Sequence, residues 1–331
     1  MNTHRTQPIR FLALPTPLIE APRLSAKLGG PQILIKRDDL TGLAMGGNKA
    51  RTLEFLIAEA KYINADILIG IGPPHSNWLS LLTAAGRKFG MDVILFILKS
   101  ECEIQGNLLL NKLLGAELKF TNMTIHELPI LHKELDNFAD KLRSEGRRPY
   151  VLRYGPVPIV GITGYISLAS EIIKQLQEKS LIAHHLFLAS GSGCTQSGLI
   201  IGAKYHKATF KIVGINPSGN SSSTVKISKI TNMVNETTTF LKIDCNVKPN
   251  EVIVYDDYIG NGPTPTKESI EAVKLCAETE GIFLDPIYTG KAMAALVDQI
   301  RQGSIKSKET VVFYHSGGLP ALFSYSEQLS K

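Results

Sequence analysis

Short apolar runs alternate with amphipathic stretches along almost the whole chain of 331 residues, and no other feature of the sequence constrains the fold as strongly. The apolar runs are rich in Ile, Val and Leu, which predicts strands that are buried on both faces of a sheet. The predicted strands are Ile33–Lys36, Ile67–Ile71, Val93–Leu98, Leu118–Phe120, Tyr150–Leu152, Leu186–Ala189, Ile212–Ile215, Val252–Val254 and Val311–Tyr314. The predicted helices are Lys49–Tyr62, Asn77–Phe89, Gln105–Leu114, Ile125–Glu145, Gly161–Leu176, Gln196–His206, Val225–Phe240, Lys267–Thr279, Gly290–Ile300 and Pro320–Gln328. Because strands that alternate with helices form βαβ units, the sequence predicts an α/β protein with mostly parallel sheets.

The predicted strands are too many for one sheet of this kind, so we expect two α/β domains. A chain of this length can bury two hydrophobic cores. The Pro- and Gly-rich stretch that begins at Gly155 and ends at Gly161 is a candidate boundary. The segment Ser218–Asn250 is the most polar part of the second half, and we expect it to be a mobile excursion at the surface.

The composition argues against several classes of function. The net charge is +6 with Lys and Arg scattered, so we expect no nucleic-acid partner, and a small anionic ligand fits the same balance. No apolar run reaches the roughly 18 residues of a membrane span, and the polar start Met1–Arg10 lacks the apolar region of a secretory signal. The cysteines form no CxxC pair, which argues against a zinc site or a disulfide framework and favours a reducing, cytoplasmic location. They are Cys102, Cys194, Cys245 and Cys276.

The stretch Gly46-Gly47-Asn48-Lys49 follows a predicted strand and a polar loop, and it opens a predicted helix. The two glycines let other backbone approach closely, and the positive end of the helix favours the unprotonated amine of Lys49. An unprotonated lysine amine can form a Schiff base with a carbonyl cofactor. Position alone also fits a capped surface helix with a solvated lysine, so the remaining motifs decide between the two.

A glycine-rich turn leads from the apolar run that ends near Ala189 into a predicted helix. Such a turn presents backbone N–H groups and small hydroxyls to a phosphate. The spacing lacks the Gly-Lys-Ser/Thr of a nucleotide-binding loop and the Gly-x-Gly-x-x-Gly of a dinucleotide site, which favours a single monophosphate. A tight turn with close helix packing is the alternative. The residues of this loop are Gly191, Ser192, Gly193, Cys194 and Thr195.

Two further regions carry polar side chains at predicted loop–helix junctions. Ser76 and Asn77 begin a helix, where free N–H groups and the serine hydroxyl can hold a carboxylate and the asparagine amide can donate to a phenolic oxygen. A simple N-cap is the alternative there. Later in the chain, Tyr288 is a candidate acid or base, and the Thr289 and Ser316 hydroxyls can bond a ring nitrogen. A buried structural tyrosine is the alternative for Tyr288.

Together and in this order, the motifs resemble those of the D-cysteine desulfhydrase / 1-aminocyclopropane-1-carboxylate deaminase family. The resemblance runs from Pro15 to about Ser324, and it is strong around Lys49 and in Asp285–Met293. The family depends on pyridoxal phosphate and has the tryptophan-synthase-β-like fold, which is fold type II of the pyridoxal-phosphate enzymes. The resemblance therefore implies a large domain of residues 1–47 plus 165–331 and a small domain of residues 48–164, with the cofactor between them.

The resemblance also implies a role for each motif. Lys49 carries the cofactor as an internal aldimine, and the loop from Gly191 to Thr195 binds its phosphate. Asn77 contacts the phenolic oxygen of the cofactor, and Ser76 with the helix start takes the substrate carboxylate. Tyr288 lies near the reacting carbon, so the implied catalytic residues are Lys49, Tyr288 and Ser76.

One position distinguishes the two branches of the family. Deaminases resemble Tyr-Glu-Gly here and desulfhydrases resemble Tyr-Thr-Gly, and this chain has Tyr288-Thr289-Gly290. Ser316 stands where desulfhydrase-like members have a threonine. A hydroxyl partner leaves the ring nitrogen less firmly protonated than a carboxylate does, so the electron sink is weaker and elimination of a good leaving group is favoured.

The chain departs from the family on the substrate side. His75 and Trp78 flank the Ser76-Asn77 pair in place of the usual residues, Pro156 interrupts a stretch that is usually Gly-Gly-Ser-Asn, and a tyrosine expected near Gly262 is absent. Trp78 either narrows the substrate pocket or packs against the neighbouring core. These departures leave the cofactor prediction intact and make the substrate the open question.

The expected reaction is α,β-elimination on a small amino acid, with D-cysteine as the leading substrate and pyruvate, ammonia and sulfide as products. Deamination of 1-aminocyclopropane-1-carboxylate is one alternative. A non-catalytic pyridoxal-phosphate-binding protein with a degenerate substrate site is the other. The resemblance implies a homodimer, and the sequence does not set the stereochemistry or the leaving group.

Overall fold

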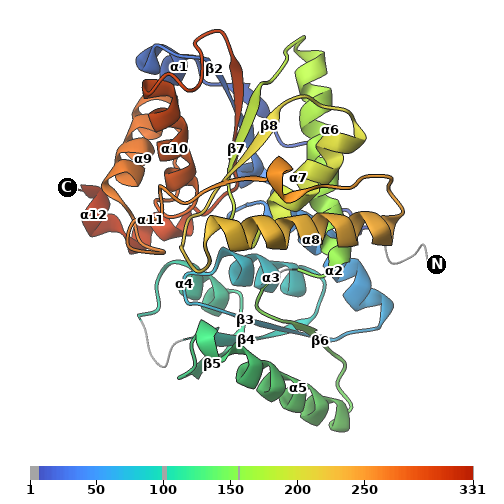
Figure 1. Cartoon of the computed structure of the whole chain (residues 1–331). Helices are drawn as coiled ribbons and strands as arrows, with labels where there is room; N and C mark the ends of the chain where they lie inside the picture. Colours follow the sequence, from blue (N-terminus) through green and yellow to red (C-terminus); the bar gives the residue numbers. More distant parts are fainter. Residues whose placement is uncertain (1–6, 99–102, 156, 331) are drawn as a thin grey trace.

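The computed structural model describes residues 7–98, 103–155 and 157–330, and this part of the chain contains two β-sheets (Figure 1). The larger is six-stranded in the order β1-β2-β10-β7-β8-β9, and the smaller is four-stranded in the order β5-β4-β3-β6. All neighbouring strands are parallel except β1 and β2. The strands are β1 Leu18–Glu20, β2 Gln32–Arg37, β3 Ile67–Gly72, β4 Asp92–Leu98, β5 Glu117–Thr121, β6 Pro149–Leu152, β7 His185–Ala189, β8 Lys211–Ile215, β9 Ile253–Tyr255 and β10 Thr310–His315. The predicted α/β class with mostly parallel sheets is confirmed.

Helices cover both faces of each sheet. The α-helices are α1 Pro22–Leu28, α2 Lys49–Tyr62, α3 Asn77–Lys88, α4 Gly106–Leu113, α5 Leu128–Ser144, α6 Ile159–Glu178, α7 Cys194–Tyr205, α8 Ser223–Leu241, α9 Lys267–Glu280, α10 Thr289–Arg301, α11 Pro320–Ser324 and α12 Ser326–Ser330. Single-turn helices lie at η2 Asp38–Leu40, η3 Ile125–Glu127 and η4 Pro249–Glu251. In Figure 1, α9 and α10 cover one face of the larger sheet and α6 and α7 the other, while α8 runs across the level between the two sheets.

The central strands explain why the sequence shows so little polar alternation. In β10, Val311 and Phe313 pack into the hydrophobic cluster with α9 and α10. Val312 and Tyr314 point to the opposite cluster, formed with α6 and α7. Both faces of the strand are therefore buried, as a parallel sheet between two helical layers requires.

The structure corrects several predicted boundaries. Strand β1 and helix α1 were not predicted, because β1 has three residues and α1 begins at Pro22 after a single linking residue. The predicted helix 320–328 is divided into α11 and α12 at Tyr325. Cys102, Pro156 and the first residues of Met1–Arg10 lie outside the described residues.

The expectation of a mobile surface excursion at 218–250 is wrong for most of that segment. Its residues form α8, which begins after Ser222, whose hydroxyl accepts a hydrogen bond from the Val225 N–H. Ile230 and Val234 of this helix are buried in the core of the larger sheet. The polar composition reflects the exposed face of an amphipathic helix, which covers the core with its other face.

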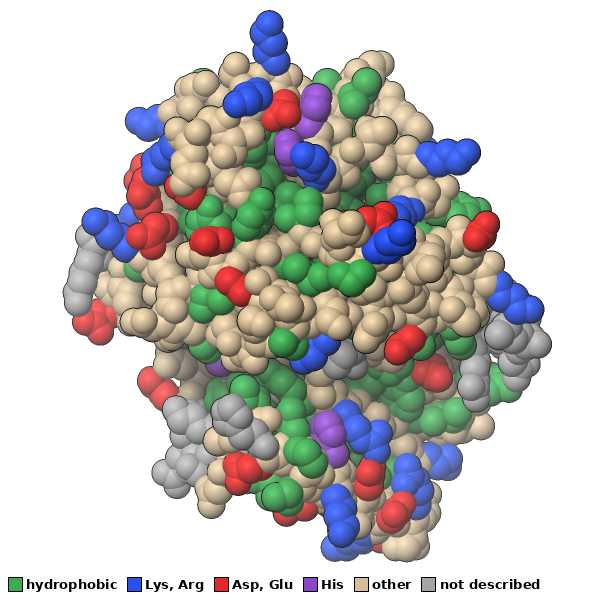
Figure 2. Space-filling model, viewed as in Figure 1, with side chains coloured by type: hydrophobic (Ala, Val, Ile, Leu, Met, Phe, Trp, Pro, Cys, Tyr) green, Lys and Arg blue, Asp and Glu red, His purple; other side chains and the backbone are tan. Residues whose placement is uncertain are grey.

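Every strand of the smaller sheet lies within 48–164, the range expected for the small domain. The boundary itself stays a prediction, since α6 continues without a break through Gly164. Figure 2 shows charged side chains of both signs scattered over the visible face, without a patch of one sign. Within the described ranges, no helix has the length and apolar character needed to cross a bilayer.

Candidate active site

Lys49 is the first residue of α2, and the turn before it depends on glycine. Gly46 has φ +70°, and a Cβ there would lie 1.8 Å from the carbonyl oxygen of Asp39, so the position admits only glycine. The Asn48 N–H donates to the carbonyl oxygen of Ser316 at 3.0 Å, which holds the turn against the end of β10. The close backbone approach predicted from the two glycines is therefore present.

The side chain of Lys49 is half-buried and makes no hydrogen bond or ion pair with any residue that the structure describes. Burial lowers the pKa of its amine, and the neighbouring Cys194 opposes this effect only in part. The lowered pKa favours the neutral, nucleophilic amine. Desolvation is the main cause of the shift.

The glycine-rich loop connects β7 to α7 and lies beside the Lys49 turn. Gly193 precedes the helix with φ +89°, and no side chain caps the first turn of α7. The N–H groups of that turn therefore have no partner within the helix and are available to an anion. The side-chain amide of Asn48 donates to Thr195 Oγ1 at 2.9 Å, so the lysine motif and the loop, which are far apart in sequence, form one site.

Three buried hydroxyls at or near this loop have no hydrogen bond to any described residue. They are Ser190 Oγ, directly before Gly191, Thr52 Oγ1 on α2 and the Tyr165 hydroxyl on α6. Burial raises the pKa of Tyr165, and the Thr52 and Thr195 hydroxyls lie close enough to oppose that rise. A buried unpaired hydroxyl costs about 1–3 kcal/mol. A ligand rich in acceptor oxygens would remove this cost, so the residues present fit a phosphorylated cofactor.

Lys226 of α8 belongs to this site and was missed by the sequence analysis. It is buried, and its Nζ donates to the carbonyl oxygen of Gly191 at 2.5 Å. Burial lowers the pKa of its amine to about 8. One turn further along α8, Ile230 packs so closely on Gly193 that a Cβ there would lie 2.7 Å from Ile230 Cγ1. The only sequence signal was the spacing of Lys226 and Ile230, which places both on one helix face.

A buried ion cluster lies behind Lys49. Arg51, in the first turn of α2, donates to Asp38 Oδ2 at 2.6 Å and to Glu171 Oε2 at 3.0 Å. Lys36 donates to Glu171, and the Tyr314 hydroxyl donates to Asp38 Oδ2 at 2.6 Å. We call Lys36, Asp38, Arg51 and Glu171 the Arg51 cluster. It joins the first turn of α2 to strands β2 and β10 and to helix α6.

The start of α3 holds the Ser76-Asn77 pair. Ser76 is the N-cap residue, and its hydroxyl accepts a long hydrogen bond of 3.4 Å from the Leu79 N–H. Asn77 Oδ1 accepts from the side-chain amide of Asn107 at 2.7 Å. Trp78 packs against the hydrophobic cluster of the smaller sheet, as the packing alternative expects. A role of Trp78 in narrowing the substrate pocket stays a prediction.

Asp285 organises the turn that carries Tyr288 and Thr289. Its carboxylate accepts from the N–H groups of Ile287, Tyr288 and Thr289 and from the Thr289 hydroxyl at 2.7 Å. The Tyr288 ring lies beside Gly191, and burial together with the Asp285 carboxylate raises its pKa, so the phenol is neutral at physiological pH. The Thr289 hydroxyl is already bonded to Asp285, and its bond to a ring nitrogen stays a prediction, as does that of Ser316.

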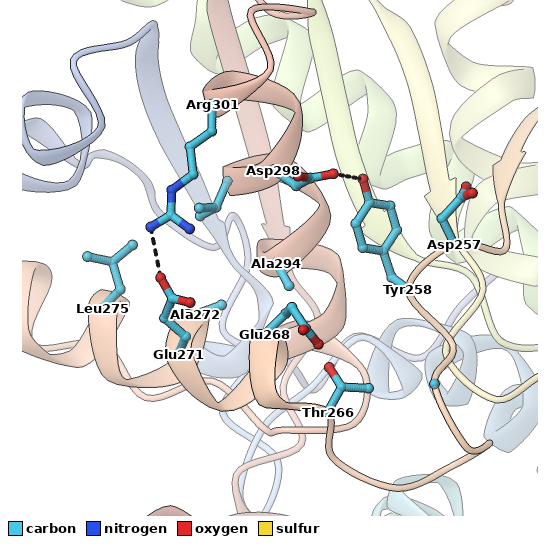
Figure 3. Close-up of a pocket in the computed structure, with 12 residues that line it drawn as sticks. Asp257, Tyr258, Thr266, Glu268, Glu271, Ala272, Leu275, Ala294, Asp298 and Arg301 are labelled. Carbon is cyan, nitrogen blue, oxygen red and sulfur yellow. Dashed lines mark hydrogen bonds and ion pairs between the residues drawn. The ribbon is translucent and has the colours of Figure 1, made fainter.

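A separate pocket of about 410 Å³ lies between α9 and α10 and contains none of the predicted site residues (Figure 3). The Tyr258 hydroxyl donates to Asp298 at 2.7 Å, and Arg301 pairs with Glu271 at 2.8 Å. Four of its twelve lining residues are carboxylates and one is an arginine, so the charge of the pocket disfavours a phosphate. It is therefore not the cofactor site.

Comparisons with known proteins identify the family of the chain. The family model described as pyridoxal-phosphate dependent enzyme matches residues 9–317. A protein of Pyrococcus abyssi, named provisionally as a 1-aminocyclopropane-1-carboxylate deaminase, is 38% identical over 97% of this chain and 94% of its own length. The D-cysteine desulfhydrase of Klebsiella pneumoniae is 36% identical over 99% of each chain. The crystal structure of an ACC deaminase homologue superposes with a TM-score of 0.88 and 33% identity, over 100% of this chain and 99% of the other. The chain therefore belongs to the pyridoxal-phosphate dependent enzymes, in the family of the D-cysteine desulfhydrases and 1-aminocyclopropane-1-carboxylate deaminases.

Proposed function

We propose that this enzyme catalyses α,β-elimination on a small amino acid with a β-thiol, with D-cysteine as the leading substrate. One amino acid and one water give one pyruvate, one ammonia and one sulfide. Pyridoxal phosphate, when bound, supplies the electron sink that stabilises negative charge at the α-carbon. The residues of the chain then have to hold the cofactor, place the substrate, remove the α-proton and stabilise the leaving thiolate.

Lys49 is the residue that binds the cofactor aldehyde and later removes the α-proton. Its pKa is lowered by burial, so its nitrogen is available as a nucleophile and as a base. The N–H groups at the start of α7, with the Thr52 and Tyr165 hydroxyls, are suited to the phosphate. Lys226 adds a positive charge next to the same loop.

Tyr288 is suited to donate a hydrogen bond to the leaving sulfur. Its raised pKa keeps the phenol neutral, so its O–H can stabilise the thiolate that forms as the bond between the β-carbon and sulfur breaks and the electron pair leaves with sulfur. The sulfide then takes its proton from water. Among the described residues, the Ser76 hydroxyl at the start of α3 accepts one long hydrogen bond, from the Leu79 N–H, and this leaves it suited to bind the substrate carboxylate.

The residues of the turn at Asp285 favour α,β-elimination over opening of a cyclopropane ring. Thr289 stands where a carboxylate would hold a proton on the ring nitrogen, and its hydroxyl is bonded to Asp285 Oδ2. The Asp285 carboxylate is itself occupied by the N–H groups of Ile287, Tyr288 and Thr289. This turn therefore offers no uncommitted carboxylate, which suits a good leaving group such as a thiol more than an unactivated cyclopropane carbon.

The test uses purified protein loaded with pyridoxal phosphate. The wild type should absorb at roughly 410–430 nm, as expected of the lysine-bound cofactor, and D-cysteine should yield pyruvate and sulfide in equal amounts. Lys49→Ala should lose both properties. Lys61→Ala, an exposed lysine in the last turn of α2, is the matched control and should keep both.

Three results contradict parts of this proposal. An unchanged spectrum in Lys49→Ala refutes the cofactor attachment. Release of 2-oxobutyrate from 1-aminocyclopropane-1-carboxylate, with no pyruvate from D-cysteine, assigns the enzyme to the deaminase branch. A normal spectrum with no keto acid from any amino acid of a D- and L-panel leaves a cofactor-binding protein without elimination activity.

A further inference from the structure

Asn107, in the first turn of α4, makes a set of hydrogen bonds that converges on Asn77. It is 2% exposed. Its Oδ1 accepts from the Ser80 hydroxyl at 2.8 Å, and its Nδ2 donates to the carbonyl oxygen of His75 at 3.0 Å and to Asn77 Oδ1 at 2.7 Å. Every bond goes to the segment that begins α3, although Asn107 itself lies on another helix.

These bonds fix which way both amides face. A backbone carbonyl can only accept, so the atom of Asn107 that faces His75 must be the nitrogen. The second hydrogen of that nitrogen then needs an acceptor, so the atom of Asn77 that faces Asn107 must be the oxygen. The nitrogen of Asn77 is consequently directed away from α4 with both of its hydrogens, and no described residue accepts them.

We propose that Asn107 is a positioning residue that holds the Asn77 amide with its N–H₂ group turned toward the phenolic oxygen of the cofactor. This inference rests on the proposed function, because it assigns Asn77 to that oxygen. Asn77 on its own could present either end of its amide, and the two ends have opposite effects. A donor stabilises the ionised phenolic oxygen, whereas a carbonyl oxygen repels it.

The decisive variant is Asn107→Asp. A carboxylate of the same shape still accepts from Ser80 but has no hydrogen to give, so Asn77 should rotate and offer its nitrogen to residue 107 instead of to the cofactor. In protein loaded with pyridoxal phosphate, the ratio of the visible band to the near-ultraviolet band should fall about tenfold or more, the effect of losing one hydrogen bond to a charged oxygen.

Asn111 provides the matched control on the same helix. It is also fully buried and also bonds a hydroxyl of α3, since its Oδ1 accepts from Thr83 at 2.9 Å, but it makes no bond to Asn77. Asn111→Asp should leave the band ratio unchanged even if it lowers the stability. Asn77→Asp, which keeps an acceptor toward Asn107 and removes the donor, should reproduce the spectrum of Asn107→Asp.

The outcomes separate this inference from the proposed function. If wild-type protein has no visible band, the proposed function fails whatever Asn107 does. If the wild type has the band and a folded Asn107→Asp protein keeps the wild-type ratio, the assignment of Asn107 is wrong. Should circular dichroism show that Asn107→Asp does not fold, Asn107→Leu removes both donated bonds and frees the Asn77 amide to turn, so its ratio should fall by less than tenfold. A folded Asn107→Leu protein with the wild-type ratio then shows that the assignment of Asn107 is wrong.

Discussion

Replacing Asp38 by alanine tests whether the Arg51 cluster holds the lysine helix in place. Asp38 accepts hydrogen bonds from Arg51 Nε at 2.6 Å and Nη2 at 2.7 Å, from Thr16 Oγ1 at 2.7 Å and from the Tyr314 hydroxyl at 2.6 Å. Asp38 is fully buried and Arg51 almost so, which means that the variant leaves a guanidinium charge in the interior with one partner fewer.

The expected loss of stability in Asp38→Ala follows from these contacts. Breaking a buried ion pair by removing one partner costs about 3–5 kcal/mol. Glu171 stays bonded to Arg51 at 3.0 Å and retains part of the compensation, so Asp38→Ala should lower the free energy of unfolding by about 3 kcal/mol, the lower end of that range. The control is Asp140→Ala, which removes an exposed pair with Arg143 and should cost about 0.5 kcal/mol or less.

Urea unfolding followed by circular dichroism measures both variants at a fixed concentration of cofactor, because bound ligand stabilises the folded state. If Asp38→Ala costs no more than Asp140→Ala, with unchanged denaturant dependence, the reasoning about the cluster is refuted.

The same cluster predicts a pH dependence. Burial opposes ionisation of Asp38 and Glu171 and is the largest single influence on each. Arg51 outweighs it only together with Tyr314 and Thr16 at Asp38 and with Lys36 at Glu171, so both pKa values lie below their ordinary 3.8 and 4.5. The unfolded carboxylates therefore take up protons at a higher pH than the folded ones. The contribution of these two carboxylates to the free energy of unfolding is complete above their ordinary pKa values, and it is lost as the pH falls below those values. Wild-type protein should lose more stability than Asp38→Ala when the pH is lowered from about 5 to about 3, and equal losses would contradict the assignment.

Two further predictions concern the cofactor site. Gly46→Ala places a Cβ 1.8 Å from the Asp39 carbonyl oxygen. It should lower the free energy of unfolding by well over the roughly 1–2 kcal/mol of a left-handed alanine, and it should weaken the visible band of the bound cofactor. The control is Gly29→Ala, at φ +59° with open space around it, which should show the conformational cost alone in thermal unfolding. Lys226→Met should weaken binding of pyridoxal phosphate about tenfold or more while leaving the binding of unphosphorylated pyridoxal nearly unchanged. Equal effects on the two ligands would contradict a role of Lys226 at the phosphate. An equal effect of Lys229→Met, which removes an exposed lysine of the same helix, would contradict it as well.

Local patterns predicted the elements well where helices and strands are long. Helix α2 was predicted at Lys49–Tyr62 and lies there, because glycines mark its start and apolar residues repeat with helical spacing. Strand β1, Leu18–Glu20, is too short to show a pattern and is defined by its pairing with β2. The polarity of 218–250 indicated exposure, but only tertiary packing shows that one face of α8 covers the core.

Some residues of the candidate site could also be predicted from local sequence patterns, and others could not. Lys49, the loop at 191–195 and the Tyr288 turn were recognisable because each is a glycine-marked junction at the start of a helix. Lys226, Asn107 and the Arg51 cluster contact partners that are distant in sequence. Lys226 bonds Gly191 across 35 residues, and Asn107 bonds Asn77 across 30 residues. A lone buried lysine or asparagine carries no local signature, so only the folded chain identifies it.

The anchoring of α2 has a consequence for how the two lobes can move. This helix packs with the smaller sheet, yet its first turn is fastened to the larger one through Arg51 and through the Asn48 N–H bond to Ser316. Any movement of the smaller sheet relative to the larger one has to bend the chain beyond that turn, so the Lys49 nitrogen stays beside the loop at 191–195 while the start of α3 moves. We therefore expect substrate entry and product release to leave the proposed attachment at Lys49 in place.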